Sequence, residues 1–171
     1  RRLDRGFARV VAEAGQRAAR DGGQHEMLRV PLFVERDRRA FLRPDGAVYR
    51  TDVAGDGFRM QLELRPTQPP LPQGDRGFSR KRPGTLSASY YYSQPHLAVS
   101  GVVTLEGRER RVTGEAWLDH EWSSDFFEPD AGGWDWMGIN LDGGGALMSF
   151  RMRDRKGGEL WSAATLRDAN G

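Results

Sequence analysis

Cysteine is absent from this chain of 171 residues, which excludes disulfide bonds and thiolate chemistry. Long apolar runs are absent too: none approaches the roughly 20 residues of a membrane-spanning helix, and no signal-peptide pattern is visible. The net charge is small, because 26 basic residues stand against 24 acidic ones and leave +2. The arginines are scattered among aspartates and glutamates, so we expect no nucleic-acid partner.

Several catalytic signatures are also missing. The chain has no GxSxG nucleophile elbow, no GxxxxGK[ST] phosphate loop and no HExxH metal helix. Asp119-His120-Glu121 has the residue types of a metal site, but in a strand His120 points away from its two neighbours. The sequence therefore predicts neither a bound metal nor another cofactor.

Alternating apolar residues and glycine turns dominate the chain after its first 22 residues. They favour an all-β fold: an antiparallel meander that closes as a lipocalin-like barrel or packs as a sandwich. A parallel α/β sheet is not expected. The predicted strands cover residues 28–35, 47–52, 57–65, 86–93, 96–105, 111–122, 134–141, 146–153 and 159–168.

Two segments break the strand pattern. Residues 1–22 are predicted to be helical, because apolar residues over Leu3–Arg20 recur at spacings of three and four. Residues 66–84 hold five prolines and three glycines and are predicted to be a loop. Such a loop either covers a binding site as a flap or serves as a linker.

The densest cluster of aromatic and titratable residues lies in GEAWLDHEW (114–122) and GWDWMGINL (133–141), which hold four of the five tryptophans. Strand alternation places His120 and Trp122 on one face, and Asp119 and Glu121 on the other. An imidazole with a pKa near 6.5 can serve as a general base or proton shuttle. The alternative is a structural histidine that donates a hydrogen bond to a neighbouring strand.

Trp134-Asp135-Trp136 places a carboxylate between two indoles. Burial would raise the pKa of Asp135 and make it a proton donor to an alkene, and indole faces stabilise a cation by about 0.5–2 kcal/mol. Strand alternation favours the other interpretation, a pair of core tryptophans with Asp135 exposed opposite them. Tyr90 and Tyr92 share a strand face and either line a cavity or simply favour strand formation.

The run SYYYSQPHLAVSGVVTLEGRERRVTGEAWLDHEWSS, followed by GWDWMGINLDGGGALMSFRMR, resembles the carotenoid 1,2-hydratase family. This family includes lipocalin-like bacterial proteins described as secreted hydrolases of the AttH type. The YYYS-P, G-AW-DHEW and WDW-LDGG-LM elements match in order and spacing over residues 79–168. The resemblance implies two lipocalin-like barrel domains, of which residues 1–171 form the first, and roles for His120, Trp122 and Asp135 at an aromatic-lined barrel mouth.

The expected function is therefore addition of water to an apolar, lipid- or isoprenoid-like molecule, or a related hydrolysis. In that hypothesis Asp135 protonates carbon and His120 orients or deprotonates the water. A further hypothesis gives the water-activating role to Glu121 or Asp119 on the opposite strand face, which must then face the interior. The aromatic residues expected to hold the substrate are Tyr90, Tyr92, Trp122, Trp134 and Trp136.

The alternative function is a carrier that holds the same hydrophobic small molecule without chemistry. The other expected partners are the second domain of the same protein and, peripherally, a membrane surface. A periplasmic or secreted location is expected from the resemblance, and the lack of cysteine fits the cytoplasm as well.

Overall fold

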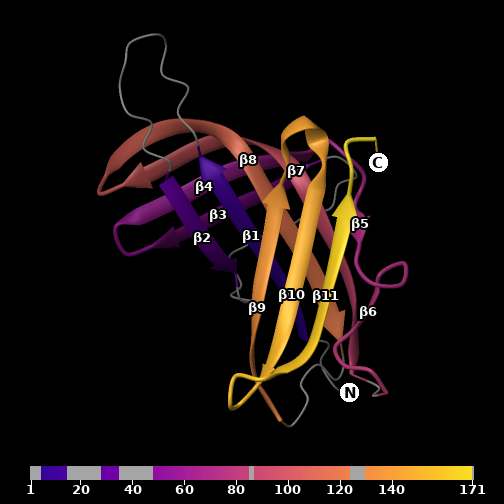
Figure 1. The fold of residues 1–171 in the computed structure, drawn as a ribbon. Coiled ribbons are helices and arrows are strands. Elements are labelled where there is room, and N and C mark those ends of the chain that lie inside the picture. The colour runs from indigo at the N-terminus through magenta and orange to yellow at the C-terminus, as the bar shows by residue number, and fades with distance from the viewer. Residues whose placement is uncertain (1–4, 15–27, 35–47, 85–86, 124–129, 171) are drawn as a thin grey trace. The chain divides into compact units, whose positions relative to one another are not determined.

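The computed structural model describes residues 5–14, 28–34, 48–84, 87–123 and 130–170, the first two ranges as backbone alone. Within these residues the elements are strands, apart from one 3₁₀ turn, η1 (Asp142–Gly144) (Figure 1). Each strand pair with a defined register is antiparallel, which confirms the all-β antiparallel prediction. The strands are β1 (Arg5–Ala14), β2 (Leu28–Val34), β3 (Tyr49–Gly55), β4 (Phe58–Pro66), β5 (Leu71–Pro72), β6 (Phe78–Arg80), β7 (Ala88–Leu105), β8 (Arg108–Ser123), β9 (Ala131–Asn140), β10 (Ala146–Asp154) and β11 (Glu159–Arg167).

The strands form two sheets. The larger one has the order β2-β1-β8-β7-β4-β3, with β5 and β6 also paired to β7, and the smaller one has the order β11-β10-β9. In the described residues neither order returns to its first strand, so both sheets are open. No helix in this part of the chain is long and apolar enough to cross a membrane.

The chain divides into two compact units. The first contains Arg1–Ala8, Pro70–Pro95 and Asp119–Gly171, and the second contains Arg9–Pro69 and His96–Leu118. The long strands β7 and β8 contribute residues to both units. The predicted site residues on β7, β8 and β9 lie within Pro70–Pro95 and Asp119–Gly171, and they therefore belong to the first unit.

The predicted N-terminal helix is wrong over Arg5–Ala14, which forms strand β1 between β2 and β8. Two features of this segment favour a strand: the adjacent β-branched residues Val10 and Val11, and Gly6, which weakens a helix. Pairing with β2 and β8 overrides the weak helical spacing of the apolar residues. The remaining parts of the predicted helix, 1–4 and 15–22, lie outside the described residues.

In the second unit, β4 pairs with β3 on one side and with β7 on the other. Alternation in β4 buries Met60, Leu62 and Leu64, as the sequence pattern predicts for a half-buried strand. Gly101 on β7 lies opposite Leu62, where a Cβ atom would stand 2.1 Å from the carbonyl oxygen of Gln61. Only glycine therefore permits this close approach of β4 and β7.

In the first unit, the predicted loop at 66–84 contains two short strands that pair with β7. Leu71 lies opposite Ser93, and Phe78 lies opposite Tyr90. Prolines are tolerated here because edge strands need few backbone donors. Glycines at positive φ, Gly74 and Gly77, make the turn between the two strands. The loop prediction is thus wrong for β5 and β6.

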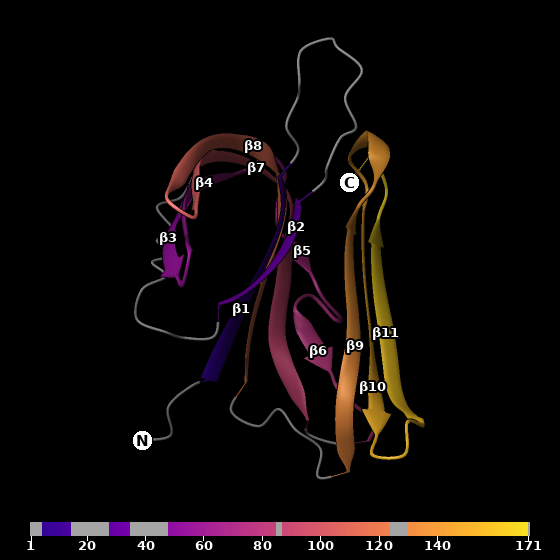
Figure 2. The same ribbon diagram turned by 90° about the vertical axis from the view of Figure 1, so that its left-hand side faces the viewer.

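The smaller sheet also belongs to the first unit, and both views show β9, β10 and β11 lying side by side (Figures 1 and 2). One face of its central strand β10 is buried and apolar, while the alternate residues are more exposed. The buried face consists of Ala146, Met148, Phe150 and Met152.

Candidate functional site

Within the first unit, the β7–β8 pair presents two chemically different faces. Residues 90 and 92 of β7 lie beside residues 120 and 122 of β8 on one face. Residues 89, 91 and 93 lie with residues 119 and 121 on the other. Strand alternation in the sequence therefore grouped these side chains correctly.

The first face is a cluster of rings, which we call the aromatic face: Phe78, Tyr90, Tyr92, His120 and Trp122. Tyr90 stacks on Trp122 with 5.6 Å between ring centroids and an interplanar angle of 23°. The His120 ring lies 5.0 Å from the Trp122 ring and 5.2 Å from the Tyr92 ring. Phe78 extends the cluster by an edge contact of 5.9 Å with Tyr90. The structure thus brings together four of the predicted site residues.

Large parts of these rings are accessible. The exposed fraction is 55% for Tyr90 and 37% for both Phe78 and Trp122. Exposed aromatic surface of this density is typical of binding sites, because isolated proteins rarely leave contiguous apolar patches uncovered. The aromatic face is therefore the best candidate in this unit for contact with an apolar ligand.

His120 is held within this cluster by one polar contact. Its Nδ1 atom lies 3.1 Å from the hydroxyl oxygen of Tyr92, a distance at which either group can donate. Desolvation by its surroundings lowers the pKa of His120 below 6.5, so the ring is neutral at pH 7. A neutral imidazole with one nitrogen engaged leaves Nε2 for a proton-transfer partner.

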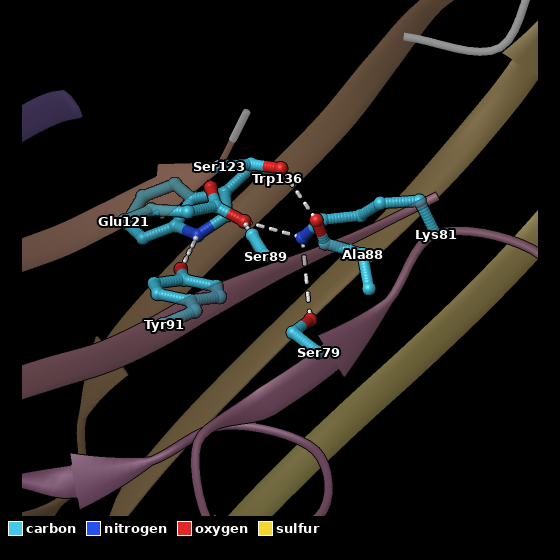
Figure 3. Close-up of polar contacts among 8 residues, drawn as sticks. All are labelled: Ser79, Lys81, Ala88, Ser89, Tyr91, Glu121, Ser123 and Trp136. Carbon is cyan, nitrogen blue, oxygen red and sulfur yellow. Dashed lines mark hydrogen bonds and ion pairs between the residues drawn. The ribbon is translucent and has the colours of Figure 1, made fainter. Parts of the chain in front are cut away.

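The opposite face holds a buried polar cluster, which we call the Lys81 network: Ser79, Lys81, Ser89 and Glu121 (Figure 3). The side chain of Lys81 is 4% exposed and that of Glu121 is 17% exposed. The Lys81 ammonium donates to the Glu121 carboxylate and to Ser79 Oγ, the latter at 3.2 Å. Ser89 donates its hydroxyl to the same Glu121 oxygen.

Two aromatic rings flank the ammonium group. Lys81 Nζ lies 4.7 Å from the ring centroid of Phe150 and 5.3 Å from that of Tyr91. Burial lowers the pKa of Lys81, while the charge and hydrogen bond of Glu121 oppose this shift. Because a buried ammonium is costly without a counter-ion, Glu121 is chiefly the partner that keeps Lys81 charged.

The network continues along β7 and β8 as further buried polar contacts. Ser93 donates its hydroxyl to Asp119 at 2.6 Å, and the Gln73 amide donates to Ser93 at 2.9 Å. Tyr91 accepts a hydrogen bond of 2.9 Å from Trp136 Nε1 of β9 (Figure 3). Burial raises the pKa of Tyr91 well above 10.0, so its phenol stays protonated.

The structure separates the second predicted aromatic motif from His120. Trp136 contacts Tyr91 on the face of β7 opposite to Tyr90 and Tyr92. Trp134, which alternation places on the same side of β9 as Trp136, is 48% exposed. These two indoles therefore lie across the β7–β8 pair from the aromatic face.

The expectation of a buried Asp135 with a raised pKa is wrong. Asp135 is exposed and accepts hydrogen bonds from Arg151 at 2.8 Å and from Arg153 at 2.9 Å. The hydrogen bond from Arg151, supported by Arg153, lowers its pKa below 3.8. The carboxylate is therefore a poor proton donor at neutral pH, and the alternative of an exposed Asp135 describes its surroundings.

The residue that sequence reasoning missed is Lys81. It is one of two lysines in a chain that otherwise uses arginine, and it directly follows β6 in the segment predicted to be a loop. The rarity of lysine in this chain was the sequence feature that could have singled out Lys81. In the described residues, no group of three or more His, Asp or Glu side chains is arranged to hold a metal ion.

Comparison with known proteins defines the class of this chain. Residues 9–171 match the AttH-like family model, and the chain therefore belongs to the AttH-like family. The resemblance to AttH-type proteins seen in the sequence is thus confirmed. A comparison with curated protein sequences found no match.

Two solved structures resemble the fold. A Nitrosomonas europaea protein assigned as AttH is 34% identical, with a TM-score of 0.80 over 97% of this chain and 66% of its own length. Kievitone hydratase from Nectria haematococca is 18% identical, with a TM-score of 0.59 over 72% of this chain and 38% of its own. The chain thus spans less than two thirds of either protein, and the second likeness concerns the fold alone.

Proposed function

We propose that the aromatic face binds an apolar, lipid- or isoprenoid-like molecule and that His120 activates water for addition to it or for a related hydrolysis. The observation that carries this proposal is the direct contact of a neutral imidazole with the half-buried ring of Tyr92 and the exposed ring of Trp122. Tyr90 and Trp122 offer a stacked pair of rings for the apolar body of the ligand.

The chemistry assigns each role to one side chain. With a proton on Nδ1 donated to Tyr92, the Nε2 atom of His120 accepts a proton from water, whose oxygen forms the bond to carbon. The imidazolium then returns that proton to the second carbon of the double bond, which must be conjugated to a carbonyl group that takes up the charge left by the attack, or to the leaving group in a hydrolysis. Asp135 takes no part, because its carboxylate is bound by two arginines.

We further propose that the larger sheet is part of the wall of a lipocalin-like barrel whose interior the aromatic face lines. Its strand order supports this, since β1 with β2, β3 with β4 and β7 with β8 are each neighbours both in the chain and in the sheet. The greater length of the Nitrosomonas protein fits a second domain, which would add to the same site or lie beside it.

The test is incorporation of labelled water. Prenylated and polyene compounds are incubated with the protein in ¹⁸O-water, and a product heavier by one labelled water is sought by mass spectrometry. His120→Gln is expected to lower the rate by about 10²–10⁴-fold, the usual contribution of a general base. Trp122→Ala should weaken binding. Trp134→Ala removes an equally large side chain from a different face and should change neither the rate nor the binding. Unchanged turnover in His120→Gln would refute the catalytic role.

A carrier without chemistry is the second candidate, and the ion-paired state of Asp135 favours it, because the expected proton donor is missing. In that case the ligand is recovered unchanged after long incubation, and His120→Gln leaves its affinity unaltered. Trp122→Ala weakens binding under either function, so this variant tests the site and His120→Gln tests the chemistry.

A further inference from the structure

The aromatic face ends at a cation. Arg80 lies on β6 two residues after Phe78, so both side chains belong to the same strand face. Its guanidinium carbon lies 5.5 Å from the centroid of the Phe78 ring. Because Phe78 lies opposite Tyr90, the rings form one continuous path from Arg80 across β7 to His120.

Among the described residues, Arg80 has no carboxylate partner, in contrast to several basic residues near it in the fold. Lys81, Arg82, Arg151 and Arg153 of the same unit all form ion pairs. Arg80 is exposed, and its guanidinium contacts the Phe78 ring. A guanidinium without a carboxylate partner beside an apolar surface is suited to bind a carboxylate or phosphate.

The spacing defines the shape of such a ligand. Arg80 of β6 pairs with Ala88 of β7, and His120 of β8 lies beside Tyr92 of β7. The Cα atoms of Arg80 and His120 are therefore separated by two strand spacings across the sheet and by four residues along β7. At about 4.8 Å per strand and 3.3 Å per residue, this separation is about 16 Å. A single ring cannot span it, whereas an extended chain lying over Tyr90 and Phe78 can.

We propose that the ligand of the aromatic face is an anionic amphiphile: an extended apolar chain whose carboxylate or phosphate group binds Arg80 while its far end lies at His120. This proposal rests on the proposed function and specifies its substrate class. The stacked rings of Tyr90 and Trp122 supply the apolar contact, and Arg80 supplies the charge that fixes the direction of the chain.

The test compares farnesoic acid with farnesol, which share one chain and differ in the charge of the terminal group. Affinity is measured by quenching of tryptophan fluorescence. Farnesoic acid should bind about tenfold more tightly, the value expected of a charge-assisted hydrogen bond, and Arg80→Gln should abolish this preference without weakening farnesol. Added salt should reduce the preference of the wild type. Arg108→Gln, at the hairpin turn between β7 and β8, is the control and should retain it.

The outcomes separate the two proposals. Equal affinity of both compounds, with Arg80→Gln having no effect, would overturn the anionic ligand and leave the apolar site standing. Binding of neither compound would overturn both. A preference for the acid that persists in Arg80→Gln would place the anion elsewhere and refute the role of Arg80.

Discussion

Replacing Glu121 by glutamine is expected to destabilise the protein far more than replacing Asp135 by asparagine. Both changes remove one negative charge from an ion pair at nearly constant side-chain volume, and both carboxylates belong to the first unit. They differ in burial: the Lys81–Glu121 pair is 4% and 17% exposed, whereas the Arg151–Asp135 pair is 50% and 51% exposed.

The magnitudes follow from this difference. Removing one partner of a buried pair leaves an uncompensated charge and typically costs about 3–5 kcal/mol. For Glu121→Gln we expect the lower value, about 3 kcal/mol, because the glutamine amide oxygen still accepts a hydrogen bond from Lys81. Exposed pairs contribute about 0–1 kcal/mol, which is the expected cost of Asp135→Asn. The double variant Lys81→Met/Glu121→Gln should recover at least half of the loss, because no buried ammonium remains.

The assay is urea denaturation followed by circular dichroism and tryptophan fluorescence at pH 7, with coincident transitions required. The two single variants should differ by about 2 kcal/mol or more in free energy of unfolding at similar denaturant dependence. Equal stabilities of Glu121→Gln and Asp135→Asn would contradict this prediction, since burial of Lys81 would then have no energetic consequence.

The pH dependence supplies a second readout of the same variant. The folded pKa of Lys81 is lowered below 10.5, so between the two values the unfolded chain binds more protons and stability rises with pH. Glu121 is the group that opposes this lowering, so its loss widens the window. Glu121→Gln should therefore gain more stability than the wild type as the pH rises toward 10.5.

Three other predictions concern the aromatic face and the core. The NMR titration of His120 should have a midpoint below 6.5, and Trp122→Ala should move it up toward 6.5, because the indole helps to desolvate the ring; an unchanged midpoint would contradict this. As pH falls from 6.5 through that midpoint, the unfolded chain takes up the proton first, so the wild type should lose stability that His120→Gln does not lose. Gly101→Ala should lower the free energy of unfolding by about 1–3 kcal/mol in thermal denaturation, since the new methyl group would meet the Gln61 carbonyl. The control is Ser100→Ala at the exposed neighbouring position, which should change the free energy of unfolding by no more than about 0.5 kcal/mol.

Strand alternation predicted the parts of the site that depend on local geometry. It placed His120 with Trp122 and put Asp119 and Glu121 on the opposite face, because the two-residue period of a strand is fixed by the backbone. The predicted strands at 111–122 and 134–141 also lie within about three residues of the bounds of β8 and β9. The same pattern could not reveal which face of the strands is covered, since that depends on how the smaller sheet packs within its unit.

The sequence did not predict the surroundings of Asp135, the conformation of β1 or the burial of Lys81, because each depends on contacts between residues far apart in the chain. Arg151 and Arg153 lie on β10, and their pairing with Asp135 follows from the β9–β10 register rather than from the residues next to it. β1 takes its strand conformation between β2 and β8, although its local spacing favours a helix. Lys81 becomes a buried cation only because residues on β8 and β10 surround it.

The proposed function depends on the aromatic face around His120 being the ligand site. Its most direct test is a two-dimensional NMR titration with farnesoic acid, in which the indole Nε1–H signal of Trp122 and the ring signals of His120 are followed. Both are expected to shift with one common affinity while the indole signal of Trp134 stays in place. Shifts at Trp134 with none at Trp122 and His120 would contradict it.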